Sequence, residues 1–425
     1  MYRIAGIDVH KKVLAVVVTD IDAPGEAAYE RRKVVYTPES LRQLAGWFIE
    51  QQVEEVVMES TAQYWQPLWS MLEQHWQPQR REREGAGKQA GSLHLAQAQS
   101  NRGRRGRKND FGDAGRLVKR LVSQELILSF VPSAEQRLWR TFTRRRTQLM
   151  QSRSRLQCHM ESLLEQAHVK LASLASDLFG VSMVRILKAL AKGESDPAVL
   201  ASLADSNLKA TKSQLMDALS PCRNWDPRYR VIIRHMMDEL DLIEKQVQEL
   251  EKNAAELMKP YEDAVQRLAE MPGMGAVSAL QVIAEIGPSA EAFPTPGELC
   301  SWVGVIPGEN ITADHNSSTH SPKGNRPLRR LLNQVAHAAI KTKGSIFELK
   351  FERFNKRMKP TAACWAVAHF ICELFWIILH KGLKYEERGP GLNTKNRCRR
   401  ISRMIRELRA LGFHVSPPAT PLLAV

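Results

Sequence analysis

The sequence lacks several features that would place a protein in a membrane or in an oxidising compartment. Its 6 cysteines are scattered and form no Cys-x-x-Cys pair, which argues against a disulfide framework and against a cysteine-based zinc site. The first residues contain no apolar segment of the kind found in signal peptides. The longest apolar stretch, 362–379, includes His369 and Glu373 and is short for a membrane span, so we expect a buried helix there. These absences predict a cytoplasmic protein with no membrane partner.

Acidic residues are also few relative to basic ones. The chain has 61 Lys and Arg but 46 Asp and Glu, a net charge of +15 at pH 7. Such an excess is typical of proteins that bind a polyanion, because each neutralised phosphate releases a condensed counterion. Contact with a ribosome or an anionic membrane would require the same sign, so charge alone does not identify the partner. The length of 425 residues, with 43% hydrophobic residues, suffices for about two or three globular domains.

The N-terminal part of the sequence predicts a mixed sheet flanked by helices. Short runs rich in β-branched residues alternate with polar turns, and Pro38 opens an amphipathic segment. We expect strands at 2–8, 13–19, 32–36 and 54–60, and helices at 38–50 and 67–74. This order of three strands, a helix, a strand and a helix belongs to the α/β class.

Four acidic residues are placed where a metal centre could form. Asp8 ends the first predicted strand and Glu59 ends the fourth, while Asp110 and Asp113 are three residues apart and would share one face at the start of a helix. Carboxylate oxygens suit Mg²⁺ or Mn²⁺, and two such ions can activate a nucleophile and stabilise a leaving oxygen in phosphodiester chemistry. Taken singly, each acid is better explained as a solvated strand end or, for Asp110, as a helix cap. The four together favour the metal centre.

Basic residues accumulate immediately before Asp110, in a segment without apolar periodicity (78–108). Glycines space the basic residues at its end, which are Arg102, Arg104, Arg105, Arg107 and Lys108. We interpret them as a loop that grips phosphate. A solvated charge run explains the composition equally well, but the position beside the acidic pair favours function. His10 and Lys11, which follow Asp8, are interpreted as neighbours of the metal ligands rather than as ligands.

The middle of the chain predicts long helices. Residues 133–172 form a helical pattern, with the arginines at 137, 140, 144, 145 and 146 expected on its exposed side. Further on, apolar residues recur at spacings of three and four, at Ile233, Met236, Leu240, Ile243, Val247, Leu250, Ala254 and Leu257. This is typical of a coiled-coil seam. The seam could pair with the same helix of a second protomer, or with the 133–172 helix of its own chain in an antiparallel pair. We favour the pair within the chain, which would then pack against the same pair of a second protomer in a dimer.

The C-terminal part is predicted to be mainly helical. Gly273 and Gly275 precede an apolar helix (277–286) and would present amide groups at its N-terminus, where phosphate can sit. This is the pattern of a helix-hairpin-helix DNA-binding element, although a plain capping turn explains it nearly as well. A polar loop (308–326) then leads into a basic amphipathic helix (327–341). Beyond Gly389 we expect a basic, partly disordered tail.

Five polar residues around the start of that basic helix fit contacts to a nucleic-acid backbone or to a transition-state phosphate. They are Lys323, Asn325, Arg326, Arg329 and Arg330. For Arg329 and Arg330, a solvated helix face is an alternative explanation.

Segments from most of the chain resemble the DEDD transposases of bacterial insertion sequences, a group that includes the Piv-type DNA invertases. The matching segments, in the family's order, are GIDVHKK (6–12), VVMEST (56–61), RGRKNDFGDAGRLV (105–118), MPGMGAVSALQVIAEIG (271–287), CSWVGVIPG (300–308) and KGNRPLRRLL (323–332). The resemblance implies a RuvC-like, RNase H-fold domain whose four acids are Asp8, Glu59, Asp110 and Asp113. We therefore expect a RuvC-like domain at 1–130, a helical coiled-coil and oligomerisation segment at 131–265, a transposase domain at 266–388 and a tail at 389–425.

The resemblance further implies a serine nucleophile and a guide RNA. Members of the family use a bridge RNA from the element's ends to select donor and target DNA, and place the serine beside the acidic centre of another subunit. In this sequence the serine position, between W-x-G-x-x-P-G and K-G-N-R, is Thr312. Threonine keeps the hydroxyl, but its methyl group restricts χ1; Ser317 and Ser318 follow nearby. Three hypotheses stand: Thr312 attacks, one of these serines attacks, or the protein is catalytically impaired.

The combined interpretation is a transposase or site-specific recombinase that excises and inserts an insertion sequence. It would act on donor and target DNA as a homodimer or homotetramer, with Mg²⁺ or Mn²⁺ and a bridge RNA. One alternative is a RuvC-like, Holliday-junction endonuclease that uses metal-activated water and no protein nucleophile. The other is a non-enzymatic architectural or RNA-binding protein that retains a decayed acidic site.

Overall fold

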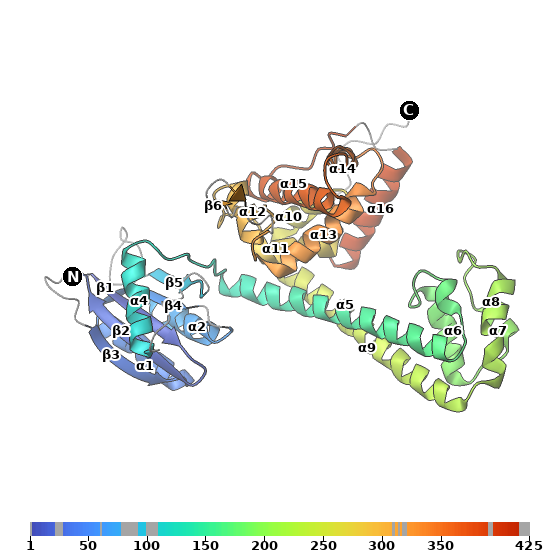
Figure 1. The fold of residues 1–425 in the computed structure, drawn as a ribbon, viewed down its shortest axis with the longest axis horizontal. Helices are drawn as coiled ribbons and strands as arrows, with labels where there is room; N and C mark the ends of the chain where they lie inside the picture. The colour runs from blue at the N-terminus through green and yellow to red at the C-terminus, as the bar shows by residue number, and fades with distance from the viewer. Residues whose placement is uncertain are drawn as a thin grey trace. The chain divides into compact units, whose positions relative to one another are not determined.

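The computed structural model describes residues 2–21, 29–59, 62–77, 92–98, 109–307, 321–389 and 394–415, with the backbone alone at 311–312, 315–316 and 394–397. The chain divides into two compact units, Met1–Ala134 and Glu135–Val425. The first is coloured blue to cyan in Figure 1, and the second runs from green to red.

The first unit is built on a mixed sheet flanked by helices, as the sequence predicts, and this sheet has five strands rather than the four expected. Its strands are β1 (Arg3–Val9), β2 (Val13–Asp20), β3 (Tyr29–Val35), β4 (Val53–Glu59) and β5 (Ser92–Ala96). They lie in the order β3-β2-β1-β4-β5. The first three strands pair antiparallel, whereas β4 is parallel to β1 and β5 is parallel to β4. Strand β5 was not predicted, because only Leu95 and Ala96 of this short strand are buried and arginine-rich sequence surrounds it.

Helices cover both faces of this sheet (Figure 1). Helices α1 (Pro38–Glu50) and α2 (Trp65–His75) pack on one face, where Ile7 and Met58 of the sheet meet Phe48 and Leu72. Helix α4 (Asp110–Val122) packs on the other face, against Ile4 and Val57. The alternation of side chains along each strand therefore assigns Gly6 and Asp8 of β1 to the face that α4 covers.

Gly6 allows α4 to lie directly on β1. A Cβ atom at this position would lie 2.3 Å from the carbonyl oxygen of Ala114 and 2.7 Å from Cγ2 of Val118. Only glycine can accept such a close approach of backbone to backbone. Helix α4 begins next to this contact, where the Asn109 side chain accepts a hydrogen bond from the N–H of Phe111. The first turn of α4 is thereby held near the end of β1.

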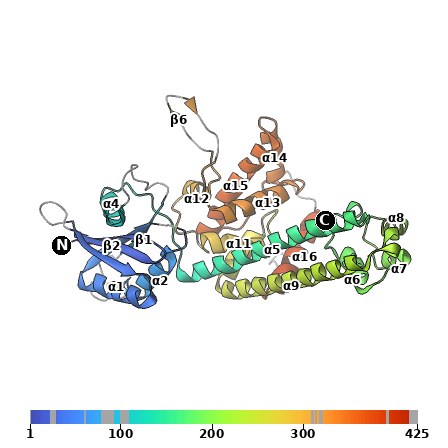
Figure 2. The same ribbon diagram turned by 60° about the horizontal axis from the view of Figure 1, so that its bottom comes forward.

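The second unit contains a long antiparallel pair, α5 (Ala134–Gln166) and α9 (Pro227–Leu257). The two helices run side by side in Figures 1 and 2. Arg146 Nε lies 2.8 Å from Glu251 Oε1, and Arg153 Nε lies 3.4 Å from Glu244 Oε1. Residue numbers rise along α5 as they fall along α9, so the pair is antiparallel. The internal pairing expected from the seam is confirmed, and packing of this pair in a dimer remains a prediction.

Three short helices close the distal end of the pair. They are α6 (Val181–Lys192), α7 (Pro197–Ser202) and α8 (Lys212–Leu219). Leu156 of α5, Ile186 of α6 and Leu240 of α9 belong to one buried cluster there. The seam of α9 is thus covered within the chain along this stretch.

Arg140 does not lie on an exposed side of α5, and that expectation was wrong. Its side chain is 12% exposed and donates to the carbonyl oxygens of Ala284 and Glu285. These are last-turn carbonyls of a helix, which lack partners within the helix itself. In the sequence, arginines that face solvent cannot be told from arginines that contact another helix. Only the tertiary packing shows that the end of α11 (Ala276–Ile286) meets Arg140.

The remaining helices form a compact C-terminal bundle. They are α10 (Glu262–Ala269), α11 (Ala276–Ile286), α12 (Pro296–Val303), α13 (Arg326–Ile340), α14 (Ile346–Asn355), α15 (Pro360–His380) and α16 (Thr394–Ala410). A two-residue pairing, β6 (Ile311–Thr312) with β7 (His315–Asn316), lies between α12 and α13. The mainly helical C-terminal part agrees with the prediction.

Helices α15 and α16 of this bundle lie in segments for which the sequence made specific predictions. Helix α15 has the length and composition of a membrane span, but 56% of its most apolar 18-residue window is buried, and it packs against α10, α12, α13 and α14, as expected of a core helix. Helix α16 lies in the segment expected to be a partly disordered tail. Leu408 of this helix and the following Phe413 are buried, so part of this segment packs on the bundle, which the scattered apolar residues of a basic segment do not predict.

Candidate metal centre and nucleic-acid interface

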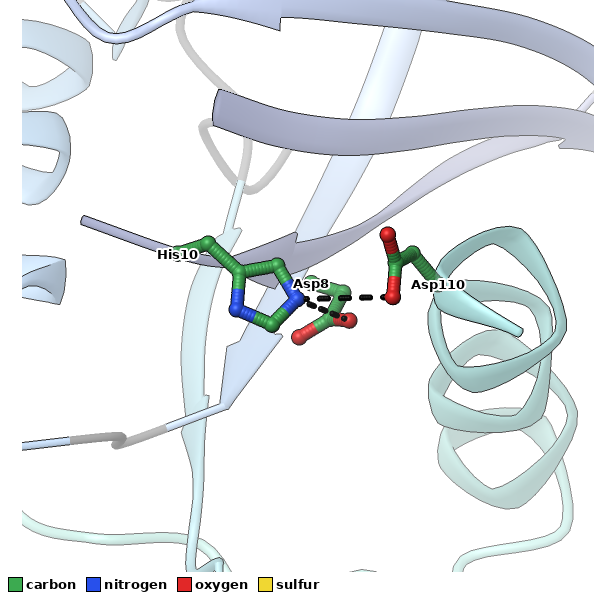
Figure 3. Close-up of side chains that lie close together, drawn as sticks. All are labelled: Asp8, His10 and Asp110. Atoms are coloured by element: carbon green, nitrogen blue, oxygen red, sulfur yellow. Dashed lines mark ion pairs between the residues drawn. The ribbon is translucent and has the colours of Figure 1, made fainter. Parts of the chain in front are cut away.

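The fold brings Asp8 and Asp110 together from distant parts of the chain. Asp8 lies near the end of β1 and is buried, whereas the side chain of Asp110, the first residue of α4, is 42% exposed. His10 Nε2 lies 3.2 Å from Asp8 Oδ2 and 3.5 Å from Asp110 Oδ1 (Figure 3). One potential ligand atom from each of the three residues lies within 4.8 Å of the others. This spacing fits three ligands of one cation.

Glu59 lies on the neighbouring strand. The parallel register of β1 and β4 pairs Ile7 with Met58, so Asp8 and Glu59 are the next residues on the two strands. Both belong to the face that α4 covers, because side chains alternate along a strand. Glu59 is half-buried and is not a member of the close group of Asp8, His10 and Asp110.

Asp113 is one helical turn from Asp110, on α4. Its Oδ1 accepts a hydrogen bond from Arg116 at 2.6 Å. The sequence analysis did not single out Arg116, although the spacing of three residues within a helix is one at which opposite charges pair. The ion pair holds the Asp113 carboxylate on the α4 surface, and a metal at Asp113 would have to share it with Arg116.

His10 takes a more central position than the sequence suggested. We expected it beside the ligands, but its Nε2 lies between the two carboxylates. Carboxylate oxygens suit Mg²⁺ and Mn²⁺, whereas imidazole is more typical of zinc, copper, iron and nickel sites. The group therefore fits a divalent cation, with Asp8 and Asp110 as oxygen donors and His10 either as a nitrogen donor or as a hydrogen-bond partner of the carboxylates.

Comparisons with known proteins relate two segments of the chain to transposases. A DEDD IS110 family model, described as "Transposase", matches residues 5–169. A second model, described as "Transposase IS116/IS110/IS902 family", matches residues 265–352. The chain belongs to the IS110 family of transposases. The predicted resemblance to the DEDD transposases of insertion sequences is thereby confirmed.

Two curated relatives share part of the chain. The "Transposase for insertion sequence element IS1111A" of Coxiella burnetii is 26% identical over 163 residues, which cover 37% of this chain and 44% of the relative. The "Insertion element IS110 uncharacterized 43.6 kDa protein" of Streptomyces coelicolor is 25% identical over 163 residues, covering 38% and 40%. The match thus spans less than half the length of either relative.

Several predicted site residues of this family member lie outside the described part of the chain. They are Arg102, Arg104, Arg105, Arg107, Lys108, Ser317 and Ser318. For Thr312 the structure describes the backbone, which pairs with His315 in the β6–β7 hairpin. The assignment of these residues remains a prediction.

Asn325 connects the predicted nucleic-acid contacts to a buried carboxylate. Its Oδ1 accepts a hydrogen bond from the N–H of Leu328 at 3.0 Å and so caps α13, while its Nδ2 donates to Glu285 Oε2 at 2.8 Å. Glu285 is 3% exposed and also accepts two hydrogen bonds from Arg144, at 2.7 and 2.8 Å. Together these contacts hold the start of α13 against α5 and α11.

The buried Glu285 is ionised because its surroundings compensate for burial. Burial opposes the charge, but the hydrogen bonds from Arg144 and the positive charges of Arg140 and Arg144 outweigh it and hold the pKa of Glu285 below its ordinary value. Burial in turn lowers the pKa of Arg140 to about 10. Glu285 could not be singled out from the sequence, because a glutamate at the end of an apolar helix carries no local signal of its partners.

Gly273 and Gly275 have packing roles in the bundle. Gly273 has a φ of +82°, and a Cβ atom there would lie 2.6 Å from the carbonyl oxygen of Val335 in α13. Gly275 is the N-cap of α11, and a Cβ there would lie 3.0 Å from Oε2 of Glu407 in α16. A carboxylate therefore lies near the helix N-terminus where we expected phosphate. Nucleic-acid contact at these glycines remains a prediction.

The basic residues at the start of α13 differ in their surroundings. Lys323, Arg326 and Arg330 are exposed. Arg329 donates to the carbonyl oxygen of Pro322 at 2.9 Å and lies over the ring of Trp365, 5.3 Å from its centroid. Arg329 thus stabilises the bundle, and the three exposed side chains are better placed to meet a nucleic acid.

Proposed function

We propose that this protein is a DNA transposase that cuts and rejoins strands during movement of an insertion element. The observation behind the proposal is the meeting of Asp8, His10 and Asp110 at the end of β1, in a chain that belongs to a transposase family. The net charge of +15 suits DNA as a substrate. The sheet order β3-β2-β1-β4-β5 supports our interpretation of the first unit as a RuvC-like, RNase H-fold domain.

The proposed metal ligands are Asp8, Glu59, Asp110 and Asp113. Mg²⁺ or Mn²⁺ bound there would supply positive charge beside a scissile phosphodiester. The protein's own residues would orient this charge: β1 and β4 present Asp8 and Glu59 at adjacent strand ends, and α4 presents Asp110 and Asp113 on one face.

Thr312 is the proposed nucleophile, in place of the family serine. Its hydroxyl oxygen would form a phosphodiester with one DNA end while the 3′ oxygen of the cleaved strand leaves, and the reverse transfer to a new end would restore the hydroxyl. Ser317 and Ser318 are the alternatives. We further propose a bridge RNA as guide, assembly as a homodimer or homotetramer, and action in the cytoplasm.

The test is a recombination assay in vitro with element-end DNA, target DNA, RNA transcribed from the flanks of the element, and Mg²⁺. The wild type is compared with Asp8→Ala, Thr312→Ser and Thr312→Val, and with Asp217→Ala as a control that removes an exposed acid on α8. We expect recombinants and a covalent protein–DNA adduct that require Asp8 and a hydroxyl at residue 312.

Each other outcome identifies a different function. Hydrolytic products without an adduct, at an unchanged rate in Thr312→Val, would identify a nuclease that uses water. Full recombination by Thr312→Val would exclude Thr312 and direct attention to Ser317 and Ser318. Joining by Thr312→Ser alone would identify an impaired transposase, and binding that survives Asp8→Ala with no strand breakage in any variant would identify a non-enzymatic protein.

A further inference from the structure

A cavity of about 290 Å³ lies between α5, α11 and α13 in the second unit. All of its lining residues belong to the second unit, and its volume is at the lower end of that of small-ligand sites. Arg146 and Gln151 of α5, Gln281 of α11, and Arg330, Leu331 and Gln334 of α13 are among its lining residues. The side chains of Gln151, Arg330 and Gln334 are exposed, so the cavity opens to solvent.

The charge of the lining favours an anionic ligand. Two arginines line the cavity, and none of its lining residues is an Asp or Glu. Arg146 is held in place by Glu251, at 2.8 Å from its Nε. Arg330 forms no ion pair with any residue that the structure describes. A phosphate at the cavity mouth would meet a guanidinium on each side, on α5 and on α13.

The three glutamines favour a ligand that has hydrogen-bond donors as well as acceptors. Each carboxamide has two N–H donors and a carbonyl acceptor. A phosphate diester has acceptors alone and leaves the carbonyls of Gln151, Gln281 and Gln334 without a partner. The edge of a nucleobase presents donors and acceptors side by side, which is why glutamine is a common partner of bases. Leu331 and Met150 add apolar surface for the face of a ring.

The walls of the cavity are held in position by contacts behind it. Gln281 Nε2 lies 3.5 Å from Thr147 Oγ1, which links α11 to α5. Asn325 and Arg144 both bind Glu285, which fixes the start of α13 against the other two helices. Such a preformed site loses less conformational entropy when it orders a flexible strand.

We propose that this cavity binds one nucleotide of a single-stranded nucleic acid, with the base among the glutamines and the phosphate between Arg146 and Arg330. The proposal rests on the proposed function, in which the protein handles nucleic-acid strands. DNA and RNA share this chemistry, and the experiment distinguishes them.

The experiment measures binding of the full-length protein to short single strands by fluorescence anisotropy. Three strands of equal length are used: DNA of mixed sequence, RNA of the same sequence, and a strand of abasic sugar-phosphate units. Gln151→Leu is compared with Gln148→Leu, an exposed position on α5 outside the cavity, and Arg330→Gln with the exposed Arg155→Gln. Circular dichroism and thermal unfolding check that each variant is folded.

The expected pattern separates base recognition from charge. Gln151→Leu weakens binding of base-bearing strands about fivefold or more and leaves binding of the abasic strand unchanged. Arg330→Gln weakens binding of all three strands and lowers the dependence of log K on log salt by about 0.7. A loss on the RNA strand alone assigns the cavity to RNA, and a loss on the DNA strand alone assigns it to DNA.

Two results would overturn the proposal. Equal affinities of Gln151→Leu and Gln148→Leu for every strand would show that the cavity binds no base, while the proposed function would stand. If Gln151→Leu weakened binding of the abasic strand as much as that of the base-bearing strands, the cavity would contact phosphate and not a base. Failure of the wild type to bind any strand or duplex would instead count against the proposed function itself.

Discussion

At the scale of single residues, two buried carboxylates have different surroundings. Glu285 faces two arginines and an amide, so its charge is balanced by protein groups. Asp8 faces the imidazole of His10 and, beyond it, the carboxylate of Asp110. Two like charges that approach each other are stabilised by a cation between them. Glu285 therefore serves the structure of the second unit, whereas the surroundings of Asp8 support our proposal that it binds a metal.

Metal binding at Asp8 can be tested without catalysis. If the cluster holds a divalent cation, Mn²⁺ at about 100 times its Kd stabilises the native protein by about 2.7 kcal/mol. We expect Asp8→Asn and Asp110→Asn to remove this stabilisation, because each loses an anionic ligand, and Asp217→Asn to retain it. The measurement is the shift of Tm with Mn²⁺ concentration; an undiminished shift in Asp8→Asn would exclude the site.

Glu285 should stabilise the second unit in a pH-dependent way. Replacement of Glu285 by Gln leaves the buried Arg140 without its counter-charge, and we expect a loss of about 3–5 kcal/mol in the free energy of unfolding. Because the folded-state pKa of Glu285 lies below its ordinary value of 4.5, this contribution is complete above pH 4.5 and disappears as the pH falls through the folded-state pKa. Urea unfolding of both proteins between neutral and acid pH measures it; a difference that grows on acidification would contradict the assignment.

At the scale of elements, the cluster of Asp8, His10 and Asp110 depends on how closely α4 lies on β1. A methyl group at Gly6 would meet the backbone of Ala114 at 2.3 Å, so Gly6→Ala must push the helix away. We expect a loss of about 1–3 kcal/mol in stability and a weaker response of Tm to Mn²⁺, because Asp110 moves away from Asp8.

Gly46 on α1 provides the matched control for Gly6. A Cβ atom at this position meets nothing within 4 Å, and alanine favours a helix interior over glycine by about 1 kcal/mol. We therefore expect Gly46→Ala to leave the protein as stable or more stable, with an unchanged Mn²⁺ response. Equal effects of the two substitutions would show that the approach of α4 to β1 does not shape the site.

At the scale of the whole molecule, the charge of +15 predicts DNA binding that depends strongly on salt. A protein that contacts about six to ten phosphates loses about 10³- to 10⁵-fold in affinity between about 50 and 200 mM salt. We expect the wild type to fall in this range with duplex DNA, measured by anisotropy at rising KCl. An affinity independent of salt would mean that the excess of arginine and lysine does not face the DNA backbone.

Local patterns in the sequence predicted most elements of the first unit. The bounds of α1 were predicted to the residue, and those of β1, β2 and β4 within one residue, because strand alternation and a proline at the first turn of a helix are local signals. Strand β5 was missed, since it gains its burial from pairing with β4 rather than from its own composition. Helix α16 was missed because the burial of Leu408 comes from packing on the bundle, whereas the composition of the helix itself is strongly basic.

The sequence by itself determined the acidic residues, the basic character of the chain and the seam on α9, all of which are properties of residue type and spacing. Tertiary structure alone decided that His10 lies between Asp8 and Asp110, that Glu285 meets Arg144 and Asn325, and that Arg140 packs against the end of α11. The physical reason is that a side chain's partners across the fold depend on how helices and strands approach one another. That approach is set by packing, as at Gly6, and leaves no trace in the spacing of the residues that meet.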